Sequence, residues 1–433
     1  MSMQAKVTVY APARTARHEA AFTWVLDSVL GLEWQWADTE EAYVQATGWR
    51  CHYGADPTLG GVGFPADGML SELGQMRREP PRTDGEQADL FAAVFWMASR
   101  MEEFLPDAPR DEYGRFMATH SIPAQQGWLD HPICEHWAFA IGARLLGAAW
   151  PDHEAALKAQ FEVVPTLDVD SAYAFRGKGG WRTGGALLRD LATGQWSHAA
   201  RRFRVIQGRE EDPYDTYQMA EEWHRERGLR AKWFFLLAKF GPHDKGLPSR
   251  SPLLEERMQR LDLDPDQEVH WHPGYAAAAD ATAMAREQAE YTRIMGRPPL
   301  AARQHYLRLM PTATRRALLA LGVSEDHTEG HAVCTGFRGG FSRSRLWYDL
   351  EAEKLTTLKI CPFAAMDATF LRHLNAPPNE VPEAVGQLAD AVRSVGGTLR
   401  LLWHNESLAP EGQWSQWEGV YPAVLDAALG TDA

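Results

Sequence analysis

The chain has 433 residues, which is too many for one ordinary hydrophobic core, so two or three domains are expected. Its hydrophobic content of 45% and charged content of 24% are typical of a globular protein. The formal charge of −14 and the lack of a lysine- and arginine-rich block argue against nucleic acid or an acidic membrane surface as the main partner. No apolar run reaches the roughly 18 residues of a membrane span, and four scattered cysteines favour a reducing, cytoplasmic setting.

The first third of the chain predicts a small mixed α/β domain, residues 1–152, of unknown role. Val7–Tyr10 and Tyr43–Thr47 have the composition of short strands. Asp89–Phe104 is the strongest helix prediction in this region, because its apolar residues fall on one face and Asp89 can cap the first turn. A domain boundary is expected at Pro151.

From residue 161 onward, strand-like and helical segments alternate. The strand-like runs cover residues 163–167, 231–238, 268–271, 300–302, 322–324, 357–360 and 398–403, and the helical segments cover 215–227, 253–261, 276–295, 313–321 and 382–395. Such alternation predicts parallel strands with right-handed crossovers. We therefore expect residues 153–433 to form a parallel β/α barrel, complete or distorted, with an open doubly wound sheet as the competing topology.

Polar side chains follow most of these strands at their carboxyl ends, where α/β proteins keep their chemistry. They are Asp168 and Asp170, His270 and His272, Arg303 and His305, Glu325 and Asp326, and His404. An aspartate with two or three histidines suits a borderline divalent ion such as Zn²⁺. A further carboxylate and a further histidine suit a general base and a general acid. The pattern therefore indicates metal-assisted hydrolysis.

These residues, in this order, resemble the polysaccharide deacetylases of the NodB-homology group, which remove acetyl groups from N-acetylated sugars. The family's first motif, Thr-Phe-Asp-Asp, corresponds here to the segment Thr166–Asp170. The resemblance implies that Asp168 is the general base and Asp170 a metal ligand, with the reverse assignment left open by the inserted Val169.

The family's second motif supplies two histidine ligands one helical turn apart, but here His272 is followed by Ala276 at the second position. His270 or His305 could replace the missing ligand, and we favour His305. The resemblance thus implies Zn²⁺ on Asp170, His272 and His305.

The remaining motifs imply roles for other strand-end residues. Arg303 matches the arginine that orients the catalytic carboxylate, Asp326 falls near a fourth-motif acid, and His404 matches the general acid. The substrate would be a carbohydrate or acylated amino sugar, with contacts expected from Arg338, Tyr275, Trp403 and Glu406. The whole chain resembles a divergent bacterial subgroup that carries an extra N-terminal domain.

Residues 175–214 form an insertion rich in glycine, arginine and tryptophan, which is either a lid over the active site or a plain helical excursion. Two other functions remain open. A metal-independent glycoside hydrolase would use Asp168 and Asp326 as its carboxylate pair. A catalytically inactive glycan-binding relative would account for Ala276 in the second motif.

Overall fold

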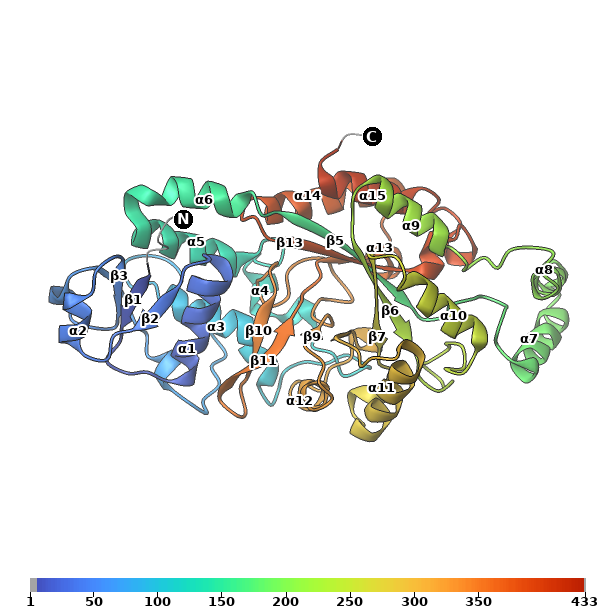
Figure 1. The fold of residues 1–433 in the computed structure, drawn as a ribbon, viewed down its shortest axis with the longest axis horizontal. Coiled ribbons are helices and arrows are strands. Elements are labelled where there is room, and N and C mark those ends of the chain that lie inside the picture. The colour runs from blue at the N-terminus through green and yellow to red at the C-terminus, as the bar shows by residue number, and fades with distance from the viewer. Residues whose placement is uncertain (1–5, 432–433) are drawn as a thin grey trace. The chain divides into compact units, whose positions relative to one another are not determined.

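The computed structural model describes residues 6–431, and the chain divides into two compact units (Figure 1). Unit 1 contains residues 1–162, 329–364 and 387–399, and unit 2 contains residues 163–328, 365–386 and 400–433. The chain therefore leaves unit 1 after residue 162 and returns to it twice, which no signal in the sequence indicated. No helix within the described range is both long and apolar enough to cross a bilayer.

Unit 1 is built on a four-stranded parallel sheet in the order β2-β1-β3-β4. Its strands are β1 (Val7–Tyr10), β2 (Trp34–Trp36), β3 (Arg50–Tyr53) and β4 (Val62–Phe64). Its helices are α1 (Ala16–Phe22), α2 (Glu40–Gln45), α3 (Leu90–Ser99), α4 (Ile122–Gln125), α5 (Ile133–Leu146) and α6 (Trp150–Lys158), and an antiparallel pair, β10 (Arg345–Asp349) and β11 (Lys354–Ile360), belongs to the same unit.

Two local predictions for unit 1 are corrected by the structure. The expected strand at Tyr43–Thr47 lies largely in α2, which begins because the Thr39 hydroxyl accepts a hydrogen bond from the Ala42 amide. The helix expected over Asp89–Phe104 has the predicted Asp89 cap, but it ends at Ser99. Arg100 then adopts φ of 56°, a left-handed conformation that stops an α-helix.

The turn at Arg100 belongs to a buried cluster of three arginines and two glutamates, which we call the arginine cluster. Its members are Arg100, Arg338, Arg345, Glu103 and Glu329. Arg338 binds both oxygens of Glu103 at 2.9 and 2.6 Å, and Arg100 adds a third bond at 3.0 Å. Arg345 and Arg100 lie 2.5 and 3.2 Å from the two oxygens of Glu329. Burial alone would raise the pKa of Glu103, but Arg100 and Arg338 outweigh it and lower this pKa to about 2.

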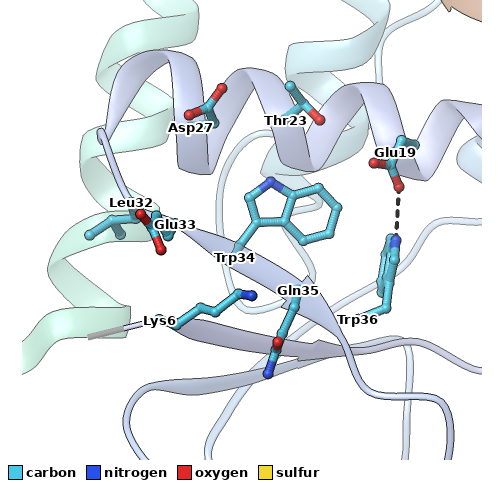
Figure 2. Close-up of a pocket in the computed structure, with 9 residues that line it drawn as sticks. All are labelled: Lys6, Glu19, Thr23, Asp27, Leu32, Glu33, Trp34, Gln35 and Trp36. Atoms are coloured by element: carbon cyan, nitrogen blue, oxygen red, sulfur yellow. Dashed lines mark hydrogen bonds between the residues drawn. The ribbon is translucent and has the colours of Figure 1, made fainter. Parts of the chain in front are cut away.

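The edge strand β2 packs beneath a π-helical segment, Thr23–Val29. Figure 2 shows Trp34 between the strand and this segment, and Trp36 donating its indole hydrogen to Glu19 at 2.8 Å. Phe22 packs against both tryptophan rings. An open hollow of about 540 Å³ remains beside Trp34. Trp34 and Trp36 are two residues apart on β2, so both project from the same face of the sheet toward the helix.

Unit 2 contains a parallel sheet in the order β9-β8-β7-β6-β5-β13-β12. The strands are β5 (Glu162–Val169), β6 (Ala231–Leu236), β7 (Gln267–His272), β8 (Ala301–Ala302), β9 (Glu325–Asp326), β12 (Ala365–Met366) and β13 (Thr398–His404). The helices are α7 (Gly180–Ala192), α8 (Trp196–Ile206), α9 (Tyr217–Glu226), α10 (Pro252–Leu261), α11 (Ala281–Met295), α12 (Ala313–Ala320), α13 (Asp367–Arg372) and α15 (Val420–Leu429), while α14 (Val381–Arg393) crosses the division between the units.

The prediction of a parallel α/β fold is confirmed, but within residues 6–431 no ladder joins β9 to β12, so these strands do not close into a barrel. The strand expected at residues 357–360 is present as part of β11, which pairs antiparallel with β10 and belongs to unit 1.

We predict that Glu103→Gln lowers the free energy of unfolding by about 3 kcal/mol, because it leaves buried guanidinium groups without their carboxylate. Urea denaturation followed by circular dichroism measures this loss. The stabilisation is present at neutral pH and disappears as the pH falls from about 4.5 toward 2, since the folded state holds the pKa of Glu103 below its ordinary value. The exposed Glu112→Gln variant is the control and should change stability by less than about 0.5 kcal/mol. Equal stability of both variants at pH 7 would contradict the prediction.

Candidate metal centre

The strand ends of unit 2 bring together an acid and two histidines. Asp170 follows β5, His272 is the last residue of β7, and His305 follows β8. The carboxyl ends of parallel strands meet at one edge of a sheet, so residues far apart in sequence converge there. Asp170, His272 and His305 each offer a ligand atom, and these atoms lie within 4.8 Å of one another.

Asp170 lies between the two imidazole rings. Its Oδ1 is 3.3 Å from His272 Nε2, and its Oδ2 is 3.2 Å from His305 Nε2. The ligand atoms of a tetrahedral zinc ion with bonds of about 2.0–2.1 Å are separated by about 3.3 Å. The spacing of these atoms therefore matches what a small divalent ion requires.

The far nitrogen of each ring is already committed as a donor. His272 Nδ1 bonds to the carbonyl oxygen of Arg303, which can only accept, so Nδ1 carries the hydrogen. In the neutral ring, His272 Nε2 thus directs a lone pair at Asp170 Oδ1, and that buried oxygen has no hydrogen-bond partner among the described residues. His305 Nδ1 bonds to Asp244 Oδ1 at 2.8 Å. Both rings are held as metal-binding histidines are, with the outer nitrogen on a carbonyl or carboxylate.

The carboxylate of Asp170 favours a positive charge between the rings of His272 and His305. Burial would raise the pKa of Asp170, but His305 and His272 hold it well below its usual range. Burial would lower the pKa of His305, yet the carboxylates of Asp170 and Asp244 raise it to about 10. A proton on His305 and a metal ion between the rings are alternative ways to meet the same demand.

Asp168 lies beside this cluster and is held by Arg303. Arg303 Nη1 donates to Asp168 Oδ1 at 2.7 Å, and Nη2 donates to the Thr166 hydroxyl at 2.8 Å. The other carboxylate oxygen, Oδ2, is 3.7 Å from His272 Nε2. One oxygen is thus fixed by the guanidinium while the other faces the cluster.

His404, the last residue of β13, forms a dyad with Asp367. Asp367 is fully buried and accepts bonds of 2.8 Å from both His404 Nδ1 and the His404 amide. Burial would lower the pKa of His404, but Asp367, Asp170 and Asp168 raise it to about 10. The imidazole therefore favours its protonated form, and its Nε2 carries a hydrogen that can be donated.

Several residues expected at the site have other surroundings. Asp326 receives bonds from Arg315 at 2.9 Å and from the Thr328 amide at 2.9 Å, so both its oxygens are engaged. Trp403 is 1% exposed and packs between Tyr421 and Phe370, so its ring lies in the core and offers no face to a substrate.

Three further candidates can also be located. Arg338 is buried in unit 1 within the arginine cluster rather than on a loop open to ligand. His270 pairs with Glu268 at 3.2 Å and is absent from the three-residue cluster. Glu406 is partly exposed, and burial together with the Asp170 charge raises its pKa. Of these three, only Glu406 is electrostatically coupled to Asp170.

Tyr275 belongs to an aromatic group beside His305. Its ring stacks on His243 at 4.0 Å and meets Tyr306 edge-on at 5.5 Å, while Tyr306 lies 4.7 Å from the His305 ring. Tyr306 has φ of 61°, an unusual conformation for a tyrosine. Strain of this kind is found at functional sites. The group forms a partly exposed aromatic rim next to the cluster.

Two residues beside the cluster were not predicted from the sequence. Asp244 lies beyond the carboxyl end of β6, and it holds both His305 and the Tyr275 amide. Asp367 begins α13 directly after the two-residue strand β12. The rule that found the other residues also applies to these, but β12 is too short to detect from its composition.

Residues 7–151 match a family model described as a family of unknown function (DUF7033). No curated protein sequence matches the chain.

Similar solved structures include a probable polysaccharide deacetylase from Pseudomonas aeruginosa PAO1. The two are 14% identical, the match covers 75% of this chain and 93% of that chain, and the TM-score is 0.41. The allantoinase Puue has 13% identity, the same coverages and a TM-score of 0.40. A GH57-type branching enzyme from the hyperthermophilic archaeon Pyrococcus horikoshii has 12% identity, 63% and 68% coverage and a TM-score of 0.35. Likeness at this level carries no argument about function.

We predict that Gly274→Ala destabilises unit 2 by about 1–3 kcal/mol, because the new Cβ would lie 2.3 Å from Ala238 Cβ and 3.2 Å from both oxygens of Asp244. Thermal and urea denaturation measure the change. Gly241→Ala, in the same loop as Asp244, has no atom nearer than 3.8 Å to its new Cβ and should leave stability unchanged or slightly raised. If Gly274→Ala were as stable as Gly241→Ala, the close packing around Asp244 would be wrong.

Proposed function

We propose that unit 2 is a divalent-metal-dependent hydrolase that removes the acyl group from an N-acylated amino sugar or glycan. The observation that supports this proposal is the meeting of Asp170, His272 and His305, whose ligand atoms lie within 4.8 Å of one another while the outer nitrogen of each ring is bonded to a carbonyl or carboxylate oxygen. The substrate class comes from the resemblance of the strand-end residues to polysaccharide deacetylases. A buried group of acceptors is costly unless a cation joins them.

One aspartate and two neutral imidazoles fit a catalytic zinc site, which keeps a coordination position open beyond its protein ligands. Such an ion supplies Lewis acidity and brings the pKa of a water molecule to about 7. Asp244 and the Arg303 carbonyl would fix the orientation of the two rings, as outer partners of metal-binding histidines do. Because His305 takes the place left by Ala276, the altered second motif does not require loss of metal binding.

Asp168 is proposed as the general base. Its Oδ1 is tied to Arg303, whereas Oδ2 faces His272 and can take a proton from a water molecule attacking the amide carbonyl. Asp170, between both rings, suits the ligand role better than Asp168 does. This supports Asp168 as the base and Asp170 as the metal ligand, although Val169 is inserted between them.

His404 is proposed as the general acid. Asp367 stabilises the imidazolium, and the proton on Nε2 can pass to the amine nitrogen as the C–N bond breaks. A glycoside hydrolase that uses Asp168 and Asp326 is less well supported, because both oxygens of Asp326 are engaged by Arg315 and the Thr328 amide.

We predict that the purified, chelator-treated protein binds one equivalent of Zn²⁺ or Co²⁺, and that His272→Ala and His305→Ala each abolish this binding. Isothermal titration calorimetry and the visible absorption of bound Co²⁺ measure it independently of turnover. His270→Asn is the matched control, because His270 lies on the same strand but pairs with Glu268. Equal metal uptake by all variants, or none by the wild type, would refute the proposed centre.

We predict that Asp168→Asn and His404→Gln retain the metal but lose about 10²–10⁴ in the rate of acetate release from N-acetylated chitooligosaccharides. Metal stoichiometry and acetate assays measure the two properties separately. Glu411→Gln changes an acid that pairs with Arg201 and should release acetate at the wild-type rate. A wild-type protein that binds metal and glycan without turnover would instead be an inactive relative.

A further inference from the structure

The insertion at residues 175–214 folds into a helical hairpin, α7 and α8, which lie side by side in Figure 1 at the end of extended connecting segments. Within residues 6–431, twelve large hydrophobic side chains are exposed, and five of them lie on these two helices. Trp181 is 73% exposed, Leu188 70%, Trp196 68% and Phe203 54%. This concentration marks the hairpin as different from the rest of the surface.

The exposed apolar residues follow the same pattern on both helices. Trp181, Gly185 and Leu188 recur at intervals of four and three, which places them on one face of α7. Trp196, Ala200 and Phe203 repeat that spacing on α8, fifteen residues later. An arginine follows each stripe, Arg189 after Leu188 and Arg204 after Phe203. Each helix therefore presents an exposed apolar stripe followed by an arginine, of which Arg204 also pairs with Glu210 at 2.9 Å.

An ion pair is buried inside the hairpin. Asp190 on α7 is 1% exposed and bonds to Arg202 on α8 at 3.0 Å and to His198 at 2.9 Å. Arg182 fixes the hairpin to the loop that carries Asp244, by bonds of 2.8 Å to the carbonyl oxygens of Lys245 and Gly246. The hairpin thus buries this pair together with the small residues Ala199 and Val205, while its largest apolar side chains stay exposed, whereas a helix pair in water usually buries such side chains.

The charge of this segment is also opposite to that of the chain. The insertion, residues 175–214, contains eight lysines and arginines and four acids, Asp190, Glu210, Glu211 and Asp212, so it is net positive, whereas the whole chain has a formal charge of −14. Two such hairpins facing each other would repel, which disfavours a second copy as the partner of the stripes. An anionic surface with an apolar interior is complementary to both the stripes and the arginines.

We propose that the α7–α8 hairpin docks on the surface of an anionic lipid bilayer, with Trp181, Leu188, Trp196 and Phe203 inserted at the boundary between headgroups and acyl chains. Tryptophan favours that depth, and arginines beside it meet lipid phosphates. Through Arg182, docking would hold the loop of Asp244 next to the membrane. The inference does not depend on the proposed hydrolase activity.

Co-sedimentation of the full-length protein with vesicles tests this inference. We expect binding to vesicles of phosphatidylcholine with 30% phosphatidylglycerol, weaker binding as salt is raised, and little binding to pure phosphatidylcholine. Leu188→Ser/Phe203→Ser should reduce the partition coefficient about tenfold or more, and Arg189→Gln about fivefold. Circular dichroism checks that both variants fold, which we expect because the changed side chains are exposed.

Leu263→Ser is the matched control, since Leu263 is 84% exposed in unit 2 but lies outside the hairpin, and its vesicle binding should equal that of the wild type. The inference is overturned if the wild type does not bind anionic vesicles, or if the Leu188→Ser/Phe203→Ser variant binds them equally. It is also overturned if the wild type is a dimer that ignores vesicles and becomes a monomer in that double variant. The stripes would then be a contact between copies.

Discussion

The proposed metal centre of unit 2 depends on the hydrogen bond between His272 Nδ1 and the carbonyl oxygen of Arg303. Because that carbonyl can only accept, Nδ1 carries a hydrogen and the ring turns Nε2 toward Asp170. Asp244 orients the ring of His305 in a similar way. The carboxylate of Asp170 between the two rings requires positive charge, which a proton on His305 or a metal ion can supply. Arg303 has a double part, since its backbone orients the ligand ring while its side chain holds Asp168.

The arginine cluster in unit 1 shows what a structural charge group looks like in the same chain. There Glu103 and Glu329 accept from three arginines, and the donors belong to the protein itself. In unit 2 the partners of Asp170 are the imidazoles of His272 and His305. Both groups are buried and rich in charge, so neither burial nor perturbed pKa distinguishes them. The kind of partner does, because guanidinium groups stay protonated whereas imidazoles can lose a proton and bind a metal ion, which favours a metal centre in unit 2 and a structural role in unit 1.

The sequence predicted the parts of the site that follow a local rule. Strand ends are visible as apolar runs, so Asp168, Asp170, His272, His305 and His404 could be found from their positions after such runs. Asp367 could not, because β12 has two residues and leaves no periodic pattern. The burial of Trp403 and Arg338 could not be predicted, because the residues that enclose them come from distant segments. The returns of the chain to unit 1 have the same origin, since long-range pairing leaves no trace in local composition.

Composition also concealed the most unusual surface of the molecule. A net charge of −14 argues against an acidic partner only if charge is spread evenly, and here residues 176–209 carry the opposite sign. Their lysines and arginines are spread over 34 residues, with three of them together at residues 201–204, and two helices bring them together. The buried Asp190–Arg202 pair then decides which way the helices face, because an ion pair inside the hairpin leaves the apolar stripes outside. Exposure of the apolar stripes to water is unfavourable. An anionic bilayer surface can accommodate both the apolar stripes and the arginines beside them.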